Sequence, residues 1–119
     1  MKIAVTSTGQ KLDSPVDPRF GRAAYILIVD SDTMNYTVLD NAENVNAFKG
    51  AGIQAAVMIS EKKAELLLTG YCGPNAFKTL DAAHIKVGGD VSGTVREAVD
   101  AYVKGKVSLV SEPNTDGHW

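Results

Sequence analysis

Two arginines, one on each side of a glycine, are the side chains of this protein that are best suited to bind a ligand. Arg19 and Arg22 lie in the segment Asp17-Pro18-Arg19-Phe20-Gly21-Arg22-Ala23. A guanidinium presents several N–H donors in a planar fork, so two of them on one loop can bind a single anion. Exposed arginines that form weak surface ion pairs remain the simpler interpretation. The apolar Phe20 between them is unusual for a purely solvated loop and favours a binding role.

Two further segments place glycines where helices are expected to begin. They are Gly50-Ala51-Gly52 and Tyr71-Cys72-Gly73-Pro74. Glycine allows a ligand to approach the backbone closely, and the free N–H groups and dipole of a helix N-terminus favour an anion. Ordinary turn formation explains any one of these glycines equally well. A binding site is therefore indicated only if both segments meet the arginine loop in space.

The single cysteine, Cys72, excludes an internal disulfide and a zinc site made of cysteines alone. It directly precedes an expected helix, a position where the pKa of a thiol tends to fall. A metal ligand and a nucleophile are both open interpretations, but a small half-buried side chain without a chemical role is favoured. Of the two histidines, His84 is interpreted as structural, and His118 lies close to the end of the chain.

Two other activities fit the sequence less well. The segment Thr6-Ser7-Thr8-Gly9 resembles a phosphate-binding loop of a flavin protein, but Pro15 and Pro18 follow it instead of the helix that such a site needs. A nuclease of ribonuclease H-like architecture needs carboxylates on its sheet to hold two metal ions. The first expected strand offers none, so neither activity is favoured.

The elements that must position these segments follow from the hydrophobic pattern. Short apolar runs bounded by turns predict strands at residues 2–6, 25–30, 36–40, 64–69 and 84–87. Helices are predicted after Gly50, Gly73 and Thr94. The residues expected to pack on the sheet are Ile53, Ala56, Val57 and Ser60, with Met58 and Ile59 alongside, then Ala76, Phe77, Leu80 and Ala83, then Val95, Ala98, Val99, Tyr102 and Val103. Thr94 and Glu97 have the spacing of a capping box. Residues 41–50 are expected to form a polar loop.

The order of these elements is βββαβαβα, which predicts an α/β fold with a mixed five-stranded sheet flanked by helices. Residues 1–107 would form one domain, and residues 108–119 a tail with one more short strand possible at 108–110. Right-handed crossovers make the first, fourth and fifth strands parallel. The loops at 7–22, 70–73 and 88–93 then share the sheet edge where ligands bind in open sheets.

Composition excludes several classes of protein. With 119 residues, 45% of them hydrophobic and 22% charged, the chain fits one globular domain rather than a disordered protein. No apolar run approaches the ~20 residues of a membrane helix, and the polar start lacks the apolar core of a secretory signal. Because 12 basic residues face 14 acidic ones, a general nucleic-acid binder is disfavoured. A single cysteine suggests the reducing cytoplasm.

Three motifs follow one another at residues 16–23, 50–56 and 69–76. The first contains Asp-x-Arg-Phe-Gly-Arg-Ala and the second Gly-Ala-Gly-Ile-Gln. In this order and spacing they resemble the dinitrogenase iron–molybdenum cofactor family, which includes NifX, NafY and the C-terminal domain of NifB. The resemblance runs from Lys2 to about Val107 and is greatest to small stand-alone members from sulfate-reducing bacteria. It implies a ribonuclease H-like fold.

The resemblance also implies a non-enzymatic protein that binds or carries an anionic metal–sulfur cluster. The expected cargo is a molybdenum–copper sulfide cluster held noncovalently, with an iron–molybdenum type cluster as second choice. Such a cluster needs N–H and guanidinium donors at its rim and apolar contacts on its faces, but no thiolate, because it brings its own sulfides. The implied cluster-binding residues are Arg19, Phe20, Gly21, Arg22, Gly50, Gly52, Ile53, Tyr71, Cys72 and Gly73.

Other functions remain open beside cluster binding. A small enzyme would use Cys72 as nucleophile or a flavin as cofactor, and would show turnover or a flavin spectrum. An interaction module of a larger complex would be colourless and would not bind thiomolybdate. Protein partners that exchange the cluster are compatible with the first function, whereas neither nucleic acid nor a membrane is expected as a partner.

Overall fold

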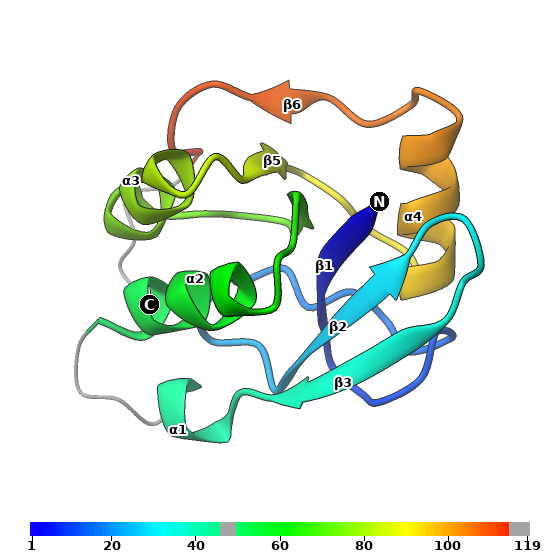
Figure 1. Ribbon diagram of the computed structural model, residues 1–119, viewed down its shortest axis with the longest axis horizontal. Helices are drawn as coiled ribbons and strands as arrows, with labels where there is room; N and C mark the ends of the chain where they lie inside the picture. The colour runs from blue at the N-terminus through cyan, green and yellow to red at the C-terminus, as the bar shows by residue number, and fades with distance from the viewer. Residues whose placement is uncertain (46–49, 115–119) are drawn as a thin grey trace.

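A six-stranded mixed sheet forms the centre of the molecule, with helices on both of its faces (Figure 1). The computed structural model describes residues 1–45 and 50–114. Along the sheet the strand order is β3-β2-β1-β4-β5-β6. The strands are β1 (Lys2–Ser7), β2 (Tyr25–Asp30), β3 (Tyr36–Asp40), β4 (Leu66–Leu68), β5 (Lys86–Gly88) and β6 (Leu109–Val110).

The central strands are parallel, and the outer ones are antiparallel. β1 pairs in parallel with β4, and β4 in parallel with β5, which confirms the expected direction of the first, fourth and fifth strands. β2 pairs antiparallel with both β1 and β3, and β6 pairs antiparallel with β5. The loops that leave β1, β4 and β5 therefore share one edge of the sheet.

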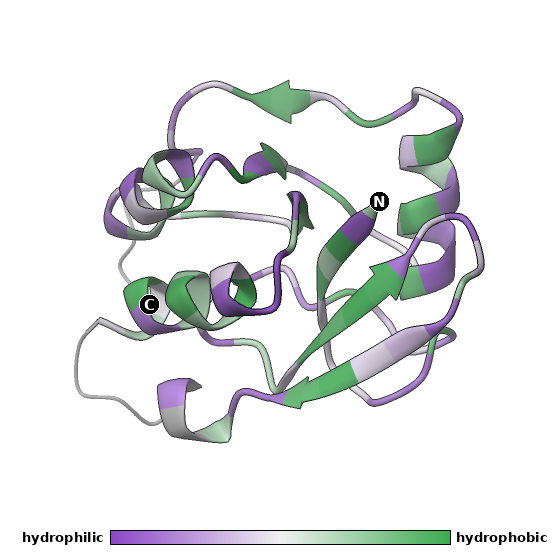
Figure 2. Cartoon of the chain, in the orientation of Figure 1, coloured by the Kyte–Doolittle hydropathy of each residue, from purple (hydrophilic) through white to green (hydrophobic). Residues whose placement is uncertain are grey.

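Alternate residues of the strands face two different helical layers. Ala4 and Leu67 belong to a core with α2 (Ala51–Glu61) and α3 (Pro74–Ala82), whereas Ile3 and Val5 pack against α4 (Val95–Val103). Figure 1 shows α2 and α3 on one side of the sheet and α4 on the other. Figure 2 shows the hydrophobic run along β2, which is buried on both faces, and the alternating hydropathy around α4.

The structure corrects the expected number of strands. The sheet has six strands, so the prediction of five is wrong, but the further short strand considered possible at 108–110 is present as β6, which pairs with Val87 and Gly88. The loop expected at 41–50 contains the short helix α1 (Ala42–Val45), and residues 46–49 lie outside the described part of the chain. The fifth strand starts later than expected, because His84 occupies a turn with a φ of 60° and is exposed.

The inward face of α2 also differs from the expected one. Its buried residues are Ala51, Ala55, Ala56 and Ile59, whereas Ile53 and Val57 are exposed by 39% and 45%. The small alanines allow α2 to pack closely on the sheet and on α3, which leaves Ile53 and Val57 on the outer side of the helix. The capping box of α4 is confirmed, because Thr94 accepts a hydrogen bond from the Glu97 N–H and Glu97 accepts one from the Thr94 N–H. In the described residues we find no helix with the length and apolar character needed to cross a bilayer.

Candidate anion-binding site at the sheet edge

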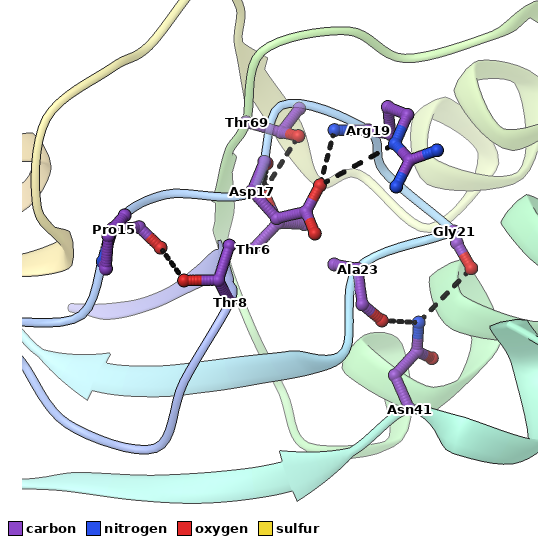
Figure 3. A network of polar contacts seen from close by, with 9 residues as sticks. All are labelled: Thr6, Thr8, Pro15, Asp17, Arg19, Gly21, Ala23, Asn41 and Thr69. Atoms are coloured by element: carbon purple, nitrogen blue, oxygen red, sulfur yellow. Dashed lines mark hydrogen bonds and ion pairs between the residues drawn. The ribbon is translucent and has the colours of Figure 1, made fainter.

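The arginine loop is fixed to the ends of β1 and β4 by a buried polar network (Figure 3). The Thr6 hydroxyl donates to the carbonyl of Asp17 at 2.6 Å and is also hydrogen-bonded to the Thr69 hydroxyl at 2.9 Å. The Asp17 carboxylate, which is almost buried, accepts the N–H of Arg19 at 3.1 Å. This Asx-turn holds the backbone just where the arginine side chain begins.

The Arg19 side chain itself is only loosely held. Its Nε lies 4.0 Å from the Asp17 carboxylate, and half of the side chain (51%) is exposed. In Figure 3 the Asp17 carboxylate is joined to the backbone N and to Nε of Arg19, and no interaction is drawn from the two terminal nitrogens to this carboxylate. Arg19 is thus tethered near the end of β1 while its side chain stays half-exposed. Arg22, three residues further on, is half-buried.

The arginine loop pairs directly with the loop that leaves β4. The Tyr71 N–H donates to the Pro18 carbonyl at 2.7 Å, and the Phe20 N–H donates to the Tyr71 carbonyl at 3.1 Å. Arg19 and Tyr71 thereby form a parallel bridge. A Cβ at Gly70 would lie 2.6 Å from the Pro18 carbonyl oxygen, so the close approach requires glycine there.

A second glycine contact joins the arginine loop to the starts of α2 and α3. Gly21 has a φ of 92°, and a Cβ on it would lie 2.8 Å from the backbone of Gly52. A Cβ on Gly52 would in turn lie 2.9 Å from the Cβ of Ala76 in the first turn of α3. The three segments singled out in the sequence, 17–23, 50–52 and 71–74, therefore meet at one edge of the sheet.

The helices that begin at this edge differ from α4 in how they are capped. The N-cap residues of α2 and α3 are Gly50 and Gly73, and neither provides a side-chain cap. α4 has its complete capping box instead. Because N-terminal N–H groups without a side-chain cap carry partial positive charge, the meeting of two such helix ends with the arginine loop favours an anionic ligand.

Phe20 and Cys72 lie beneath this edge rather than on it. Their exposed fractions are 3% and 0%, and both belong to the core between the sheet and α2 and α3. Burial raises the pKa of the Cys72 thiol to about 12. The expected fall in this pKa at a helix N-terminus is wrong, because burial removes the hydration that the thiolate needs and so raises the pKa.

The exposed apolar residues of the edge are Tyr71 and Ile53, whose side chains are exposed by 41% and 39%. Tyr71 is bridged to Arg19, and Ile53 follows Gly52 in the first turn of α2. Within residues 1–45 and 50–114, no three His, Cys, Asp or Glu side chains are grouped so that they could hold a metal ion. The donors that the edge does offer are N–H groups and guanidinium, which suit the rim of an anion.

Sequence reasoning missed Asn41, which braces the far end of the arginine loop. This residue is fully buried, and its amide donates to the carbonyls of Gly21 at 3.2 Å and Ala23 at 2.8 Å (Figure 3). Its carbonyl accepts from the Asn44 amide at 2.7 Å. Nothing in the sequence marks this asparagine, because the residues that it holds lie 18 and 20 positions earlier.

A small mixed sheet with glycine-rich loops gathered at one edge is the architecture of a known protein family. The sequence profile described as dinitrogenase iron–molybdenum cofactor matches residues 1–105. The chain belongs to this family, as the motifs at 16–23, 50–56 and 69–76 led us to expect. Searching curated proteins gave no significant match.

Solved structures agree with this membership. The apo form of the orange protein from Desulfovibrio gigas is 48% identical, with 96% of each chain covered and a TM-score of 0.94. A putative NifB protein from Thermotoga is 34% identical over 98% of each chain, with a TM-score of 0.83. A putative dinitrogenase from Methanocaldococcus jannaschii shares the fold, at 16% identity, a TM-score of 0.69 and coverage of 95% of this chain and 97% of that one. The description of the family refers to the iron–molybdenum cofactor, which links the chain to the binding or carriage of a metal cluster.

Proposed function

We propose that this protein binds a molybdenum–copper sulfide cluster noncovalently at the edge where the arginine loop meets the starts of α2 and α3. The observation that carries the proposal is the chain of close contacts from Gly21 to Gly52 to Ala76, which brings the arginine loop beside two helix N-termini without side-chain caps. The residues proposed to touch the cluster are Arg19, Arg22, Gly50, Gly52, Ile53, Tyr71 and Gly73, whereas Gly21 is buried against Gly52 and positions the loop.

The chemistry of these residues suits such a cargo. A thiomolybdate-type cluster spreads several negative charges over soft sulfur atoms, which accept hydrogen bonds from backbone N–H groups and from guanidinium. Its faces are weakly hydrated, so the exposed Ile53 and Tyr71 can cover them at little cost. Together these donors and apolar surfaces bind a large anion without forming a bond to its metals.

In this proposal Phe20 and Cys72 pack beneath the site and do not contact the cluster. A thiol whose pKa is about 12 is protonated at neutral pH, and soft copper(I) binds a thiolate rather than a thiol. Because the cluster supplies its own sulfides, it needs no ligand from Cys72. This also argues against the enzyme hypothesis, since a buried neutral thiol is a poor nucleophile.

An iron–molybdenum type cluster is the second candidate cargo. The description of the family names that cofactor, and N–H and guanidinium donors would bind any sulfide cluster with negative charge. Metal analysis of the protein purified from its native source distinguishes the two, since only one of them brings copper.

Reconstitution tests the proposal. We expect the apo protein, mixed with tetrathiomolybdate and a copper salt, to give a coloured complex that passes a desalting column at low salt with molybdenum and copper in fixed ratio to protein. A flavin added in the same way should separate from the protein. Metal that separates completely from the protein would refute cluster binding in this form, and retention of flavin would favour the enzyme hypothesis.

We also infer that the fold is ribonuclease H-like, as the family resemblance implies. The order β3-β2-β1-β4-β5, with β2 antiparallel to its neighbours and β1, β4 and β5 parallel, supports this classification.

A further inference from the structure

The chain after β6 returns to the candidate site and ends its described course at Asn114 (Figure 1). Three hydrogen bonds join Asn114 to the loop that leaves β4. The Cys72 N–H donates to Asn114 Oδ1 at 2.7 Å, Asn114 Nδ2 donates to the Gly70 carbonyl at 3.0 Å, and the Asn114 N–H donates to the Cys72 carbonyl at 3.3 Å. Asn114 lies nine residues beyond the part of the chain matched by the family profile, which ends at residue 105.

The side chain of Asn114 takes the place of a peptide group in a neighbouring strand. A carboxamide has the same acceptor and donor as a peptide unit, and here it pairs with residues 70 and 72, which are two positions apart. Residue 71 between them turns its own N–H and carbonyl the other way, toward Pro18 and Phe20. Residues 70–72 therefore form the middle one of three neighbouring segments, with the arginine loop on one side and Asn114 on the other.

The surroundings of Asn114 are shaped to admit it. A Cβ at Gly89 would lie 2.7 Å from Asn114 Nδ2, so the amide packs directly on the backbone of the loop after β5. The same Gly70 carbonyl also accepts the N–H of Asp90 at 2.7 Å. Asn114 thus joins the loops that leave β4 and β5, and it does so beside the start of α3.

We propose that Asn114 is a positioning residue for the cluster site, and this rests on the function proposed above. By pairing with Gly70 and Cys72, it holds the middle chain in the extended form that the Arg19–Tyr71 bridge requires. It fixes Tyr71 and the start of α3 relative to Arg19 before the cluster arrives. Its contribution is preorganisation, so its loss raises the dissociation constant while the rest of the fold persists.

Full-length variants separate this role from general stabilisation. Asn114→Ala removes both side-chain bonds, whereas Asn114→Asp keeps an acceptor for the Cys72 N–H but replaces the bond to Gly70 by repulsion between a carboxylate oxygen and the Gly70 carbonyl. Gly89→Ala leaves the amide chemically unchanged but displaces it, because the new Cβ would lie 2.7 Å from Asn114 Nδ2 and also 3.0 Å from Val110 Cγ1. Ser111→Ala is a matched control, since Ser111 is exposed and lies in the same segment. Amide hydrogen exchange by NMR and titration with tetrathiomolybdate plus a copper salt are measured for each variant.

In Asn114→Ala and Gly89→Ala we expect exchange of the Cys72 amide to accelerate about tenfold or more, with the amides of β1 unchanged. The Asp variant should keep the Cys72 amide protected. The dissociation constant of the cluster should rise about three- to tenfold in the Ala variants and stay unchanged in Ser111→Ala.

Amide hydrogen exchange and cluster affinity can each contradict the proposal independently. Acceleration that spreads equally over β1 and β4, or an unchanged Cys72 amide, would overturn the positioning role of Asn114. A local loss of protection at Cys72 with unchanged cluster affinity would overturn it too. If no variant and no wild-type protein binds the cluster, the proposed function fails, while the exchange data still report whether Asn114 orders the loop.

Discussion

Replacing Arg19 by alanine should weaken cluster binding strongly and stability hardly at all. Half of the side chain is exposed, and its ion pair with Asp17 is long, at 4.0 Å. Exposed pairs of this kind contribute at most ~1 kcal/mol to the free energy of unfolding. The backbone N–H of residue 19, which holds the Asx-turn, is kept in the variant.

The loss of binding follows from the kind of contact that is removed. A hydrogen bond to a charged group contributes about 1.5–3 kcal/mol, and each 1.4 kcal/mol is tenfold in affinity. The dissociation constant should therefore rise roughly ten- to a hundredfold in Arg19→Ala. Arg19→Lys keeps the charge but loses the planar fork, and should lie between the alanine variant and the wild type.

Arg96 offers a matched control on the other face of the sheet. Its side chain is exposed to the same extent, 52%, and its ion pair with Asp13, at 3.1 Å, is shorter than that of Arg19. Both alanine variants remove one positive charge, so they change the net charge of the protein equally. Titration with tetrathiomolybdate and a copper salt, followed by absorbance, gives the affinities, and urea denaturation gives the stabilities.

Equal weakening of binding in Arg19→Ala and Arg96→Ala would refute the reasoning, because it would mean that only net charge matters. Unchanged affinity in an Arg19→Ala, Arg22→Ala double variant would move the site away from this loop. A large loss of stability in Arg19→Ala alone would show that the side chain has a structural role that its exposure does not suggest.

Four further outcomes are expected. Cys72→Ser should keep the metal content and colour of the reconstituted protein, and loss of copper alone by elemental analysis would show that the thiol is a ligand. Burial raises the pKa of Cys72 from 9.0 to about 12, so the protonated thiol contributes stability below pH 9, and this contribution is lost as the pH rises toward 12. For the same reason, iodoacetamide at pH 8 should label Cys72 only after the protein is unfolded. Asn41→Ala leaves the carbonyls of Gly21 and Ala23 without their buried donor, and should lower the free energy of unfolding by about 2–4 kcal/mol in urea. Gly52→Ala should separate α2 from α3, lower the melting temperature and weaken cluster binding, whereas an unchanged melting temperature would contradict the contact geometry.

Much of the fold could be predicted because it depends on local patterns. The apolar run of β2 and the Thr94–Glu97 capping box are visible in the sequence, and the structure contains both. β6 has only two residues, so it has no period of its own and exists through its pairing with β5. The face of α2 was mispredicted because hydropathy favours Ile53, whereas the close contact with α3 favours small residues such as Gly52.

Residues of the candidate site could be predicted where the residue type itself indicates a role, but not where the role depends on tertiary contacts. Glycines before helices and paired arginines pointed to three segments, and the structure brings these together. Asn41 and Asn114 hold backbone groups that are 18 to 44 positions away, which no local pattern encodes. For Cys72, the rule for helix N-termini failed because burial, a property of the whole fold, dominates its pKa.

The location of the bound cluster tests the account most directly. Molybdenum(VI) and copper(I) are both diamagnetic, so the amide resonances of the reconstituted protein can be followed by two-dimensional NMR during titration with tetrathiomolybdate and a copper salt. We predict the largest shifts at residues 19–22, 50–53 and 71–76, and little change at the capped start of α4, residues 94–97. Shifts centred on α4 or on the edge strand β3, with residues 19–22 unaffected, would contradict a cluster site at the uncapped helix ends.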